Sequence, residues 1–187
     1  SHANKNRMIP FAKKLQILHQ IATGMQFLHA RNIIHRDLKC DNVLLDSYDM
    51  AKISDFGISR AKADGINSNQ QMTQMVGTNV YMAPELVLNE FYDEKCDVFS
   101  FAIIMFELLV ETTKPYGSGT VTFNIELRVA KNPLFRPVPP PTFDLKEECM
   151  WYIELMSSCW KHLAKDRKSF TEIIAELEKH IGDTGDK

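Results

Sequence analysis

The segment that decides the fold reads His35-Arg36-Asp37-Leu38-Lys39-Cys40-Asp41-Asn42. It lies between short apolar stretches and combines a carboxylate, an ammonium group and an amide. The carboxylate of Asp37 can accept the proton of a hydroxyl group, and Lys39 can neutralise charge on a transferred phosphoryl group. The amide oxygen of Asn42 suits a hard cation such as Mg²⁺. The segment therefore contains groups that phosphoryl-transfer chemistry requires.

Two further segments follow in the chain. The first, Asp55-Phe56-Gly57, joins a second candidate Mg²⁺ ligand to a flexible glycine hinge. The second reads Gly77-Thr78-Asn79-Val80-Tyr81-Met82-Ala83-Pro84-Glu85. Each short motif alone is typical of a surface turn, but the order and spacing of all three make chance a poor explanation.

Together the three segments resemble the catalytic and activation segments of the eukaryotic protein kinase family. The resemblance covers the chain from about Phe11 onward. It implies that Asp37 is the catalytic base, that Lys39 contacts the γ-phosphate of ATP, and that Asn42 and Asp55 bind Mg²⁺. The implied activity of the full-length protein is the transfer of this phosphate to a protein hydroxyl, with ATP and Mg²⁺ as cofactors.

The same resemblance implies supporting roles around the site. Leu44 takes the position that forms the floor beneath adenine. His35 and Phe56 take the lower positions of a hydrophobic spine that Asp97 holds in place, and Gly57 completes the Asp-Phe-Gly motif.

Other implied roles concern the activation segment. Arg36 precedes the catalytic base, as in kinases whose activation loop is ordered by a phosphate, which a guanidinium binds through two hydrogen bonds. Thr73 and Ser68 are candidate phosphorylation sites, whereas Thr78 is expected in the substrate pocket. A further expectation is an ion pair between Glu85 and Arg167.

Two regions of the sequence point to a subgroup. Lys39 and the Gly77-Thr78 pair resemble serine/threonine kinases, while Cys159-Trp160, Arg167 and the run from Phe170 to Ile174 resemble tyrosine kinases and their relatives. The combination is typical of the tyrosine-kinase-like group, with serine/threonine chemistry. In the expected central helix, Phe99 and Ala102 stand where Trp and Gly are usual, which leaves the packing of that helix as a question for the structure.

Hydrophobic periodicity predicts a mainly α-helical lobe: six helices in a bundle, with a few short strands at the catalytic rim. Five of the expected helices cover about 11–31, 94–111, 120–131, 144–163 and 169–181, and the last two carry capping signals at Asp144 with Glu147 and at Ser169 with Glu172. The expected strands are 33–34, 43–45 and 51–53. The proline-rich run 137–141 is expected to be an extended connector.

Composition narrows the class of protein. The chain has 187 residues and a net charge of −2, so no broad positive field exists to hold nucleic acid. The longest apolar stretch, 96–110, is too short and too charged to span a bilayer. The four cysteines show no C-x-x-C spacing, which favours a reduced, intracellular and cytoplasmic setting. The sequence leaves open a membrane tether elsewhere in the full-length protein.

We expect residues 1–10 to end a connecting segment, with a Ser-His-Ala start that resembles a tag remnant. Residues 11–181 are expected to form the C-terminal lobe of a kinase, with a catalytic loop at 35–42 and an activation segment at 55–85. Residues 182–187 are expected to be a flexible tail. The glycine-rich loop G-x-G-x-x-G is absent from the sequence. The N-terminal lobe is therefore expected outside these residues, and the fragment alone is expected to be inactive, with weak or no nucleotide binding.

Alternatives to an active kinase remain at this stage. One is a non-catalytic, pseudokinase-like scaffold, against which the intact catalytic residues weigh. Another is a self-associating module, because apolar surface around Leu44 and Phe56 would be uncovered without the N-terminal lobe. The expected partners are a protein substrate, the missing lobe and a second copy, bound through the exposed surface or by exchange of activation loops.

Overall fold

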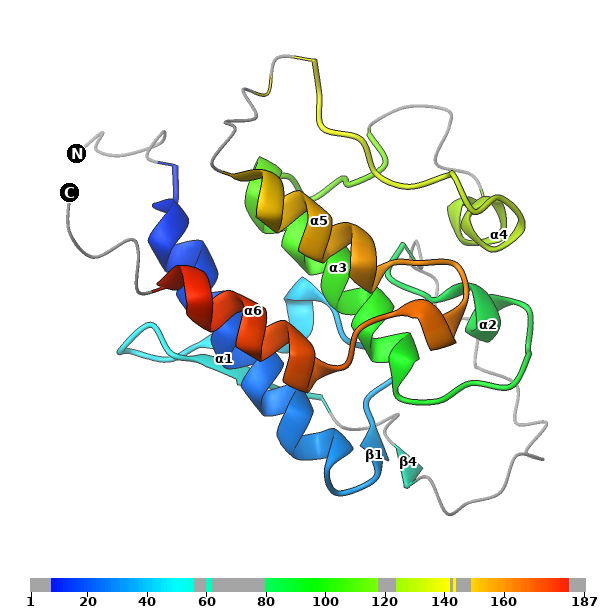
Figure 1. Cartoon of the computed structure of the whole chain (residues 1–187), viewed down its shortest axis with the longest axis horizontal. Helices are drawn as coiled ribbons and strands as arrows, with labels where there is room; N and C mark the ends of the chain where they lie inside the picture. Colours follow the sequence, from blue (N-terminus) through cyan, green and yellow to red (C-terminus); the bar gives the residue numbers. More distant parts are fainter. Residues whose placement is uncertain are drawn as a thin grey trace.

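The computed structural model describes residues 8–55, 60–61, 80–117, 124–141, 143 and 149–181. This part of the chain is mainly helical, as predicted (Figure 1). Its α-helices are α1 (Phe11–His29), α2 (Pro84–Val87), α3 (Lys95–Val110), α4 (Ile125–Lys131), α5 (Met150–Cys159) and α6 (Phe170–Ile181). Its strands are β1 (Ile33–Ile34), β2 (Val43–Leu45), β3 (Ala51–Ile53) and β4 (Arg60–Ala61), and two short 3-10 helices, η1 (Cys40–Asn42) and η5 (Ala164–Asp166), complete it.

Helix α3 forms the centre of the bundle, as its nearly all-apolar surface predicted. Only Lys95, Leu108 and Val110 of this helix are not buried. Phe99 and Ala102, the two departures from the kinase pattern, are both fully buried. The helix bundle therefore packs closely with these residues in place.

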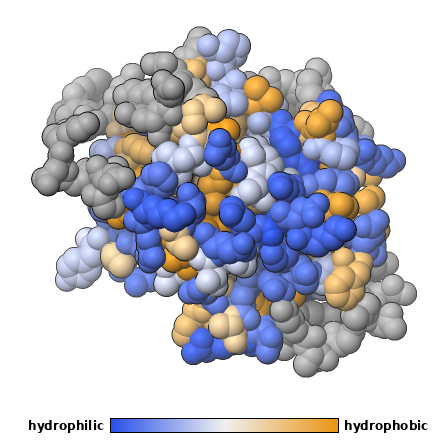
Figure 2. Space-filling model, viewed as in Figure 1, coloured by the Kyte–Doolittle hydropathy of each residue, from blue (hydrophilic) through white to orange (hydrophobic). Residues whose placement is uncertain are grey.

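Helices α1 and α6 lie side by side along one flank of α3 (Figure 1). The buried side chains of α6 are Phe170, Ile173 and Leu177, a spacing that places them on one helical face. The Phe170 ring contacts Phe101 of α3 edge to face, with 5.4 Å between ring centroids. Hydrophilic side chains cover much of the face of the molecule that the same view presents (Figure 2).

The strands form two small antiparallel sheets at the rim of the bundle. Strands β2 and β3 pair with Val43 opposite Ile53, and β1 pairs with β4 with Ile33 opposite Ala61. The three strands predicted from sequence coincide with β1, β2 and β3. Strand β3 packs against α1, so the β2–β3 hairpin is held on the helical bundle.

Helix α5 ends earlier than the sequence predicted, at Cys159 instead of residue 163. The carbonyl oxygens of Lys161 and His162 accept hydrogen bonds from the Arg167 guanidinium at 2.7 and 2.9 Å. A continued helix would turn these carbonyls toward its own backbone N–H groups, so the contacts with Arg167 favour an early end. The expected start of this helix, with Asp144 and Glu147, lies outside the described residues.

Two other predicted helices have corrected boundaries. Helix α4 begins at Ile125, because Asn124 has a left-handed conformation with a φ of 54°; residues 118–123 lie outside the described part. Helix α1 ends at His29, two residues before the predicted end.

Helix α2 was not assigned from the sequence. It is a single turn that starts at Pro84, a residue suited to the first helical position.

The capping box before α6 is confirmed. Ser169 donates through its backbone N–H and its hydroxyl to Glu172 Oε2, each at 2.7 Å, and the Glu172 N–H donates back to Ser169 Oγ at 3.3 Å. The run 137–140 has neither helix nor strand, in agreement with the predicted extended connector.

Candidate active site

The predicted catalytic loop connects β1 to β2 through η1. Leu38 in its middle is fully buried, whereas the side chains of Asp37 and Lys39 on either side are each 22% exposed. This alternation of buried and exposed side chains places Asp37 and Lys39 on the same side of the loop. The Lys39 Nζ atom accordingly lies 2.7 Å from Asp37 Oδ2 and donates a hydrogen bond to it.

Asn42 completes the group of three side chains. Its Nδ2 atom donates to the Asp37 carbonyl oxygen at 2.7 Å and to Asp37 Oδ2 at 3.1 Å, and the residue is buried. Oδ2 of Asp37 thus accepts hydrogen bonds from two side chains. Its Oδ1 accepts no hydrogen bond from the described residues, and this oxygen is available to a hydroxyl proton.

The residue before Asp55 connects the second acidic motif to this loop. The backbone N–H and the hydroxyl of Ser54 donate to the Asn42 carbonyl oxygen at 2.9 and 3.2 Å. The His35 ring donates through Nε2 to the Ser54 carbonyl oxygen at 3.1 Å. Asp55 itself is exposed and has a left-handed backbone with a φ of 62°. The two candidate Mg²⁺ ligands, Asn42 and Asp55, are therefore held on adjoining backbone.

Asp97, in the first turn of α3, binds the start of the catalytic loop as expected. Its Oδ2 accepts from the His35 N–H at 2.9 Å, and its Oδ1 accepts from the Arg36 N–H at 2.8 Å. Arg36 has a φ of 66°, a conformation that is costly for a side chain other than glycine. The two hydrogen bonds to a fully buried carboxylate stabilise this conformation.

His29 is a third partner of Asp97, which the sequence did not reveal. Its Nε2 lies 2.8 Å from Asp97 Oδ2. The imidazole also contacts the Phe170 ring, with 5.2 Å between centroids. The only signal in the sequence was its position in the last turn of the helix that leads into the catalytic loop.

The guanidinium of Arg36 is only partly satisfied. Its Nη1 donates to the Tyr92 hydroxyl at 3.4 Å. Its Nε is buried and has no hydrogen-bond partner in the described part of the chain. A buried donor of this kind gains from an anionic partner, which agrees with the predicted role of Arg36 toward a phosphate.

The predicted ion pair of Glu85 and Arg167 is confirmed. Arg167 donates to both carboxylate oxygens of Glu85, at 2.6 and 2.8 Å, and both residues are buried. The guanidinium carbon also lies 5.2 Å from the centroid of the Phe99 ring, and Arg136 lies at the same distance from this ring. Phe99 thus contributes an aromatic surface for two cations.

The remaining predicted site residues divide into two groups. Leu44 lies on β2 and is 55% exposed, beside Leu45, which is 50% exposed. Phe56, Gly57, Ser68, Thr73 and Thr78 lie outside the described residues. The structure therefore brings Asp37, Lys39 and Asn42 together. Of the residues in this last set, it locates only Leu44.

The donor atoms fit Mg²⁺. Nδ2 of Asn42 is used by Asp37, so the amide oxygen is the atom left for a cation, and the carboxylate of Asp55 supplies charge. No group of three or more His, Cys, Asp or Glu side chains that suits a metal ion occurs within the described residues. A cation held by one amide and one carboxylate takes its further ligands from water and phosphate, as Mg²⁺ commonly does.

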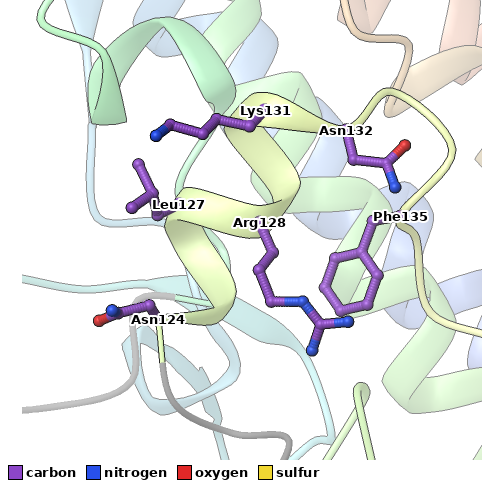
Figure 3. A pocket seen from close by; sticks show the side chains of 6 residues that line it. All are labelled: Asn124, Leu127, Arg128, Lys131, Asn132 and Phe135. Atoms are coloured by element: carbon purple, nitrogen blue, oxygen red, sulfur yellow. The ribbon is translucent and has the colours of Figure 1, made fainter.

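A surface pocket beside α4 is separate from this group of residues (Figure 3). The Arg128 guanidinium carbon lies 4.1 Å from the centroid of the Phe135 ring, so a cation–π contact forms part of its wall. The residues that line it all come from α4 and the chain on either side of that helix: Asn124, Leu127, Arg128, Lys131, Asn132 and Phe135. It contains none of the predicted catalytic residues, and we assign it no part in the chemistry of the site.

Comparison with known proteins defines the class. Residues 2–177 match the family of protein tyrosine and serine/threonine kinases, and the chain belongs to this family. It is similar to the probable serine/threonine-protein kinase drkC of Dictyostelium discoideum, with 41% identity over 160 residues that cover 84% of this chain and 20% of drkC.

Two other kinases are similar to the chain at a comparable level of identity. The serine/threonine-protein kinase STY17 of Arabidopsis thaliana is 36% identical over 172 residues, covering 92% of this chain and 28% of STY17. The dual specificity protein kinase shkB of Dictyostelium discoideum is 36% identical over 166 residues, covering 88% of this chain and 24% of shkB. The chain thus spans between a fifth and about three tenths of the length of these relatives. Among the described residues, no helix has the length and apolar character needed to cross a membrane.

Proposed function

We propose that residues 11–181 are the C-terminal catalytic lobe of a protein serine/threonine kinase of the tyrosine-kinase-like group. The observation that supports this most strongly is the convergence of Lys39 and Asn42 on one oxygen of Asp37. This arrangement leaves the other oxygen of Asp37 for a substrate hydroxyl. The names of the relatives support serine/threonine chemistry.

In the proposed reaction, Asp37 Oδ1 accepts the proton of a serine or threonine hydroxyl. The hydroxyl oxygen forms a bond to the γ-phosphorus of ATP while the bond from that phosphorus to the ADP oxygen breaks. Lys39 neutralises charge on the phosphoryl oxygens during this transfer. Mg²⁺, held by Asn42 and Asp55, supplies further charge neutralisation when it is bound.

The exposed β2 residues support a second part of the proposal, that an N-terminal lobe covers this rim. Leu44 and Leu45 present an apolar surface to solvent, and nucleotide pockets enclose most of their ligand. The lobe described here supplies only one side of such an enclosure. We therefore expect negligible phosphotransfer from these 187 residues alone.

An intracellular, cytoplasmic location is part of the proposal. None of the four cysteines, all of which lie in the described residues, forms a disulfide bond, and reduced cysteines in a chain of this size agree with a reducing compartment. The buried Nε of Arg36 supports regulation by phosphorylation of the activation segment, with Thr73 as the proposed site.

The test uses a longer protein that includes the upstream sequence. It is expected to phosphorylate serine or threonine in a peptide or in itself, and Asp37→Asn is expected to reduce the rate by about 100-fold or more. Asp49→Asn is a matched control, because Asp49 is exposed in the β2–β3 turn with a left-handed φ of 60° that Asn also tolerates. Robust activity of the Asp37→Asn variant would show that Asp37 is not the base, whereas a longer wild-type protein without any activity would favour the scaffold alternative.

The exposed β2 surface also favours a second candidate function, self-association of this lobe. Light scattering on the 187-residue chain would test this candidate function. The variant Leu44→Asp places a charge in the apolar surface, and it is expected to shift a dimer toward monomer. A monomeric wild-type chain at micromolar concentration would contradict self-association.

A further inference from the structure

Three segments of the chain meet at one buried carboxylate that has no part in the proposed transfer step. Glu107 of α3 is 6% exposed, and its Oε2 accepts a hydrogen bond from the Cys40 thiol at 3.0 Å. The same oxygen accepts from the Tyr81 hydroxyl at 2.7 Å. Cys40 belongs to η1 in the catalytic loop, and Tyr81 belongs to the segment that leads into α2.

We propose that Cys40 is a positioning residue, which acts through Glu107 to hold the catalytic loop in register with the segment around Tyr81. Only the kinetic consequence of this inference rests on the proposed kinase function. The geometric part concerns how two segments of one chain are held on α3.

Cys40 is placed to transmit a displacement to the site. It directly follows Lys39, and the Asn42 N–H donates to the Lys39 carbonyl oxygen at 3.0 Å across η1. A shift of the Cys40 backbone therefore moves both side chains that donate to Asp37.

The other side of the cluster is also held by α3. The Ser100 hydroxyl donates to the Tyr81 carbonyl oxygen at 2.8 Å, while Glu107 accepts from the Tyr81 hydroxyl. Helix α3 thus fixes both the backbone and the side-chain end of Tyr81. The thiol of Cys40 links the catalytic loop to the same oxygen of Glu107 that binds Tyr81.

The protonation of the donors agrees with these roles. Burial raises the pKa of the Cys40 thiol, and the neighbouring Glu107 carboxylate raises it further. Burial likewise raises the pKa of Tyr81. Both groups donate to a carboxylate oxygen in the structure, so the thiol of Cys40 serves here as a hydrogen-bond donor.

The alternative is that Cys40 only fills space, and a serine substitution separates the two roles. Cys40→Ser keeps a donor of similar size, whereas Cys40→Ala removes it and leaves Glu107 Oε2 with Tyr81 alone. In the full-length kinase, Cys40→Ala is expected to lower kcat for a peptide substrate by about 2- to 10-fold, the effect of one hydrogen bond. Cys40→Ser is expected to stay within about twofold of wild type by the same measure, and the KM for ATP should not change.

A double-mutant cycle with Tyr81→Phe tests the shared oxygen. Because both donors bind Oε2, the effect of Cys40→Ala on kcat should differ between the protein that keeps the Tyr81 hydroxyl and the variant that lacks it. Equal losses in the alanine and serine variants, or no loss in either, would overturn the proposal. Strict additivity in the cycle would overturn it as well.

A second measurement does not depend on kinase activity. Hydrogen exchange of the Asn42 amide in the 187-residue chain should accelerate severalfold in Cys40→Ala and return to the wild-type rate in Cys40→Ser. Cys149→Ala, which removes a half-buried thiol next to α5, is the matched control and should leave Asn42 unchanged. Unchanged exchange in Cys40→Ala would refute the geometric inference, while an inactive full-length protein with accelerated exchange would refute only the proposed function.

Discussion

Arg167 and Glu85 form a bidentate ion pair inside the protein, although 82 residues separate them in the sequence. The Arg167 side chain is fully buried, and three backbone carbonyl oxygens, of Lys95, Lys161 and His162, accept its remaining hydrogen bonds. The pair therefore connects the start of α2 to the chain between α5 and α6. The positive charge of Arg167 and the negative charge of Glu85 neutralise each other inside the bundle. Loss of either residue leaves the other charge buried without a partner.

We predict that Arg167→Ala lowers the free energy of unfolding by about 3–5 kcal/mol, because it leaves the Glu85 carboxylate buried and unpaired. Urea denaturation of the two proteins measures this difference. Lys179→Ala is the control, since Lys179 forms an exposed ion pair with Glu176 at 2.7 Å, and such pairs contribute less than about 1 kcal/mol. Similar losses in the two variants would contradict the importance of burial.

A second prediction concerns the two histidines of α1. His29→Ala removes the side-chain donor to Asp97 and is expected to cost about 1–3 kcal/mol, the range for a hydrogen bond to a buried charged group. His19 lies on the same helix but contacts Glu178, whose side chain is 61% exposed. His19→Ala is therefore expected to cost less than about 0.5 kcal/mol. Thermal unfolding would measure both, and an equal effect would contradict the role of His29.

The capping box before α6 leads to a prediction about pH. Hydrogen bonds from the Ser169 backbone and then from its hydroxyl lower the pKa of Glu172 below its usual 4.5. A lowered pKa in the folded state means that the ionised form stabilises the fold above pH 4.5, and that this contribution is lost as the pH falls through the folded-state pKa. Glu172→Gln keeps a side-chain acceptor but removes the charge, so wild type should exceed it in stability at pH 7.

This advantage of wild type should shrink at pH values below 4.5, when Glu172 becomes protonated. Urea denaturation at pH 7 and in acid would reveal it, and a difference that does not change with pH would contradict the assignment. Ser169→Ala removes the hydroxyl of the cap and should cost about 0.5–2 kcal/mol at pH 7.

A fourth prediction concerns nucleotide binding. Calorimetry of the 187-residue chain with Mg-ATP should show no saturable binding in the micromolar range, because the proposed role of Leu44 gives this lobe only one side of a nucleotide pocket, and such pockets normally enclose their ligand. The longer protein with its upstream sequence should bind under the same conditions. A micromolar Kd for the 187-residue chain would contradict this prediction.

Much of the architecture was predictable because its signals are local. The apolar faces of α1, α3 and α6, the three strands and the Ser169–Glu172 capping box each depend on residues only a few positions apart. The candidate catalytic group was predictable for the same reason, since Asp37, Lys39 and Asn42 lie in one loop. The chemistry of their side chains and their spacing together indicated the class of reaction.

Other features were decided only by the tertiary structure. His29 meets Asp97 across 68 residues, Cys40 meets Glu107 across 67, and α5 ends where the carbonyl groups after it bind Arg167. The physical reason is that these contacts arise when α1, the catalytic loop and the chain between α5 and α6 pack around α3, and no local periodicity encodes which polar groups then become neighbours. The sequence alone determined the apolar faces of the main helices and the residues of the catalytic loop, whereas packing around α3 determined which residues hold that loop in place.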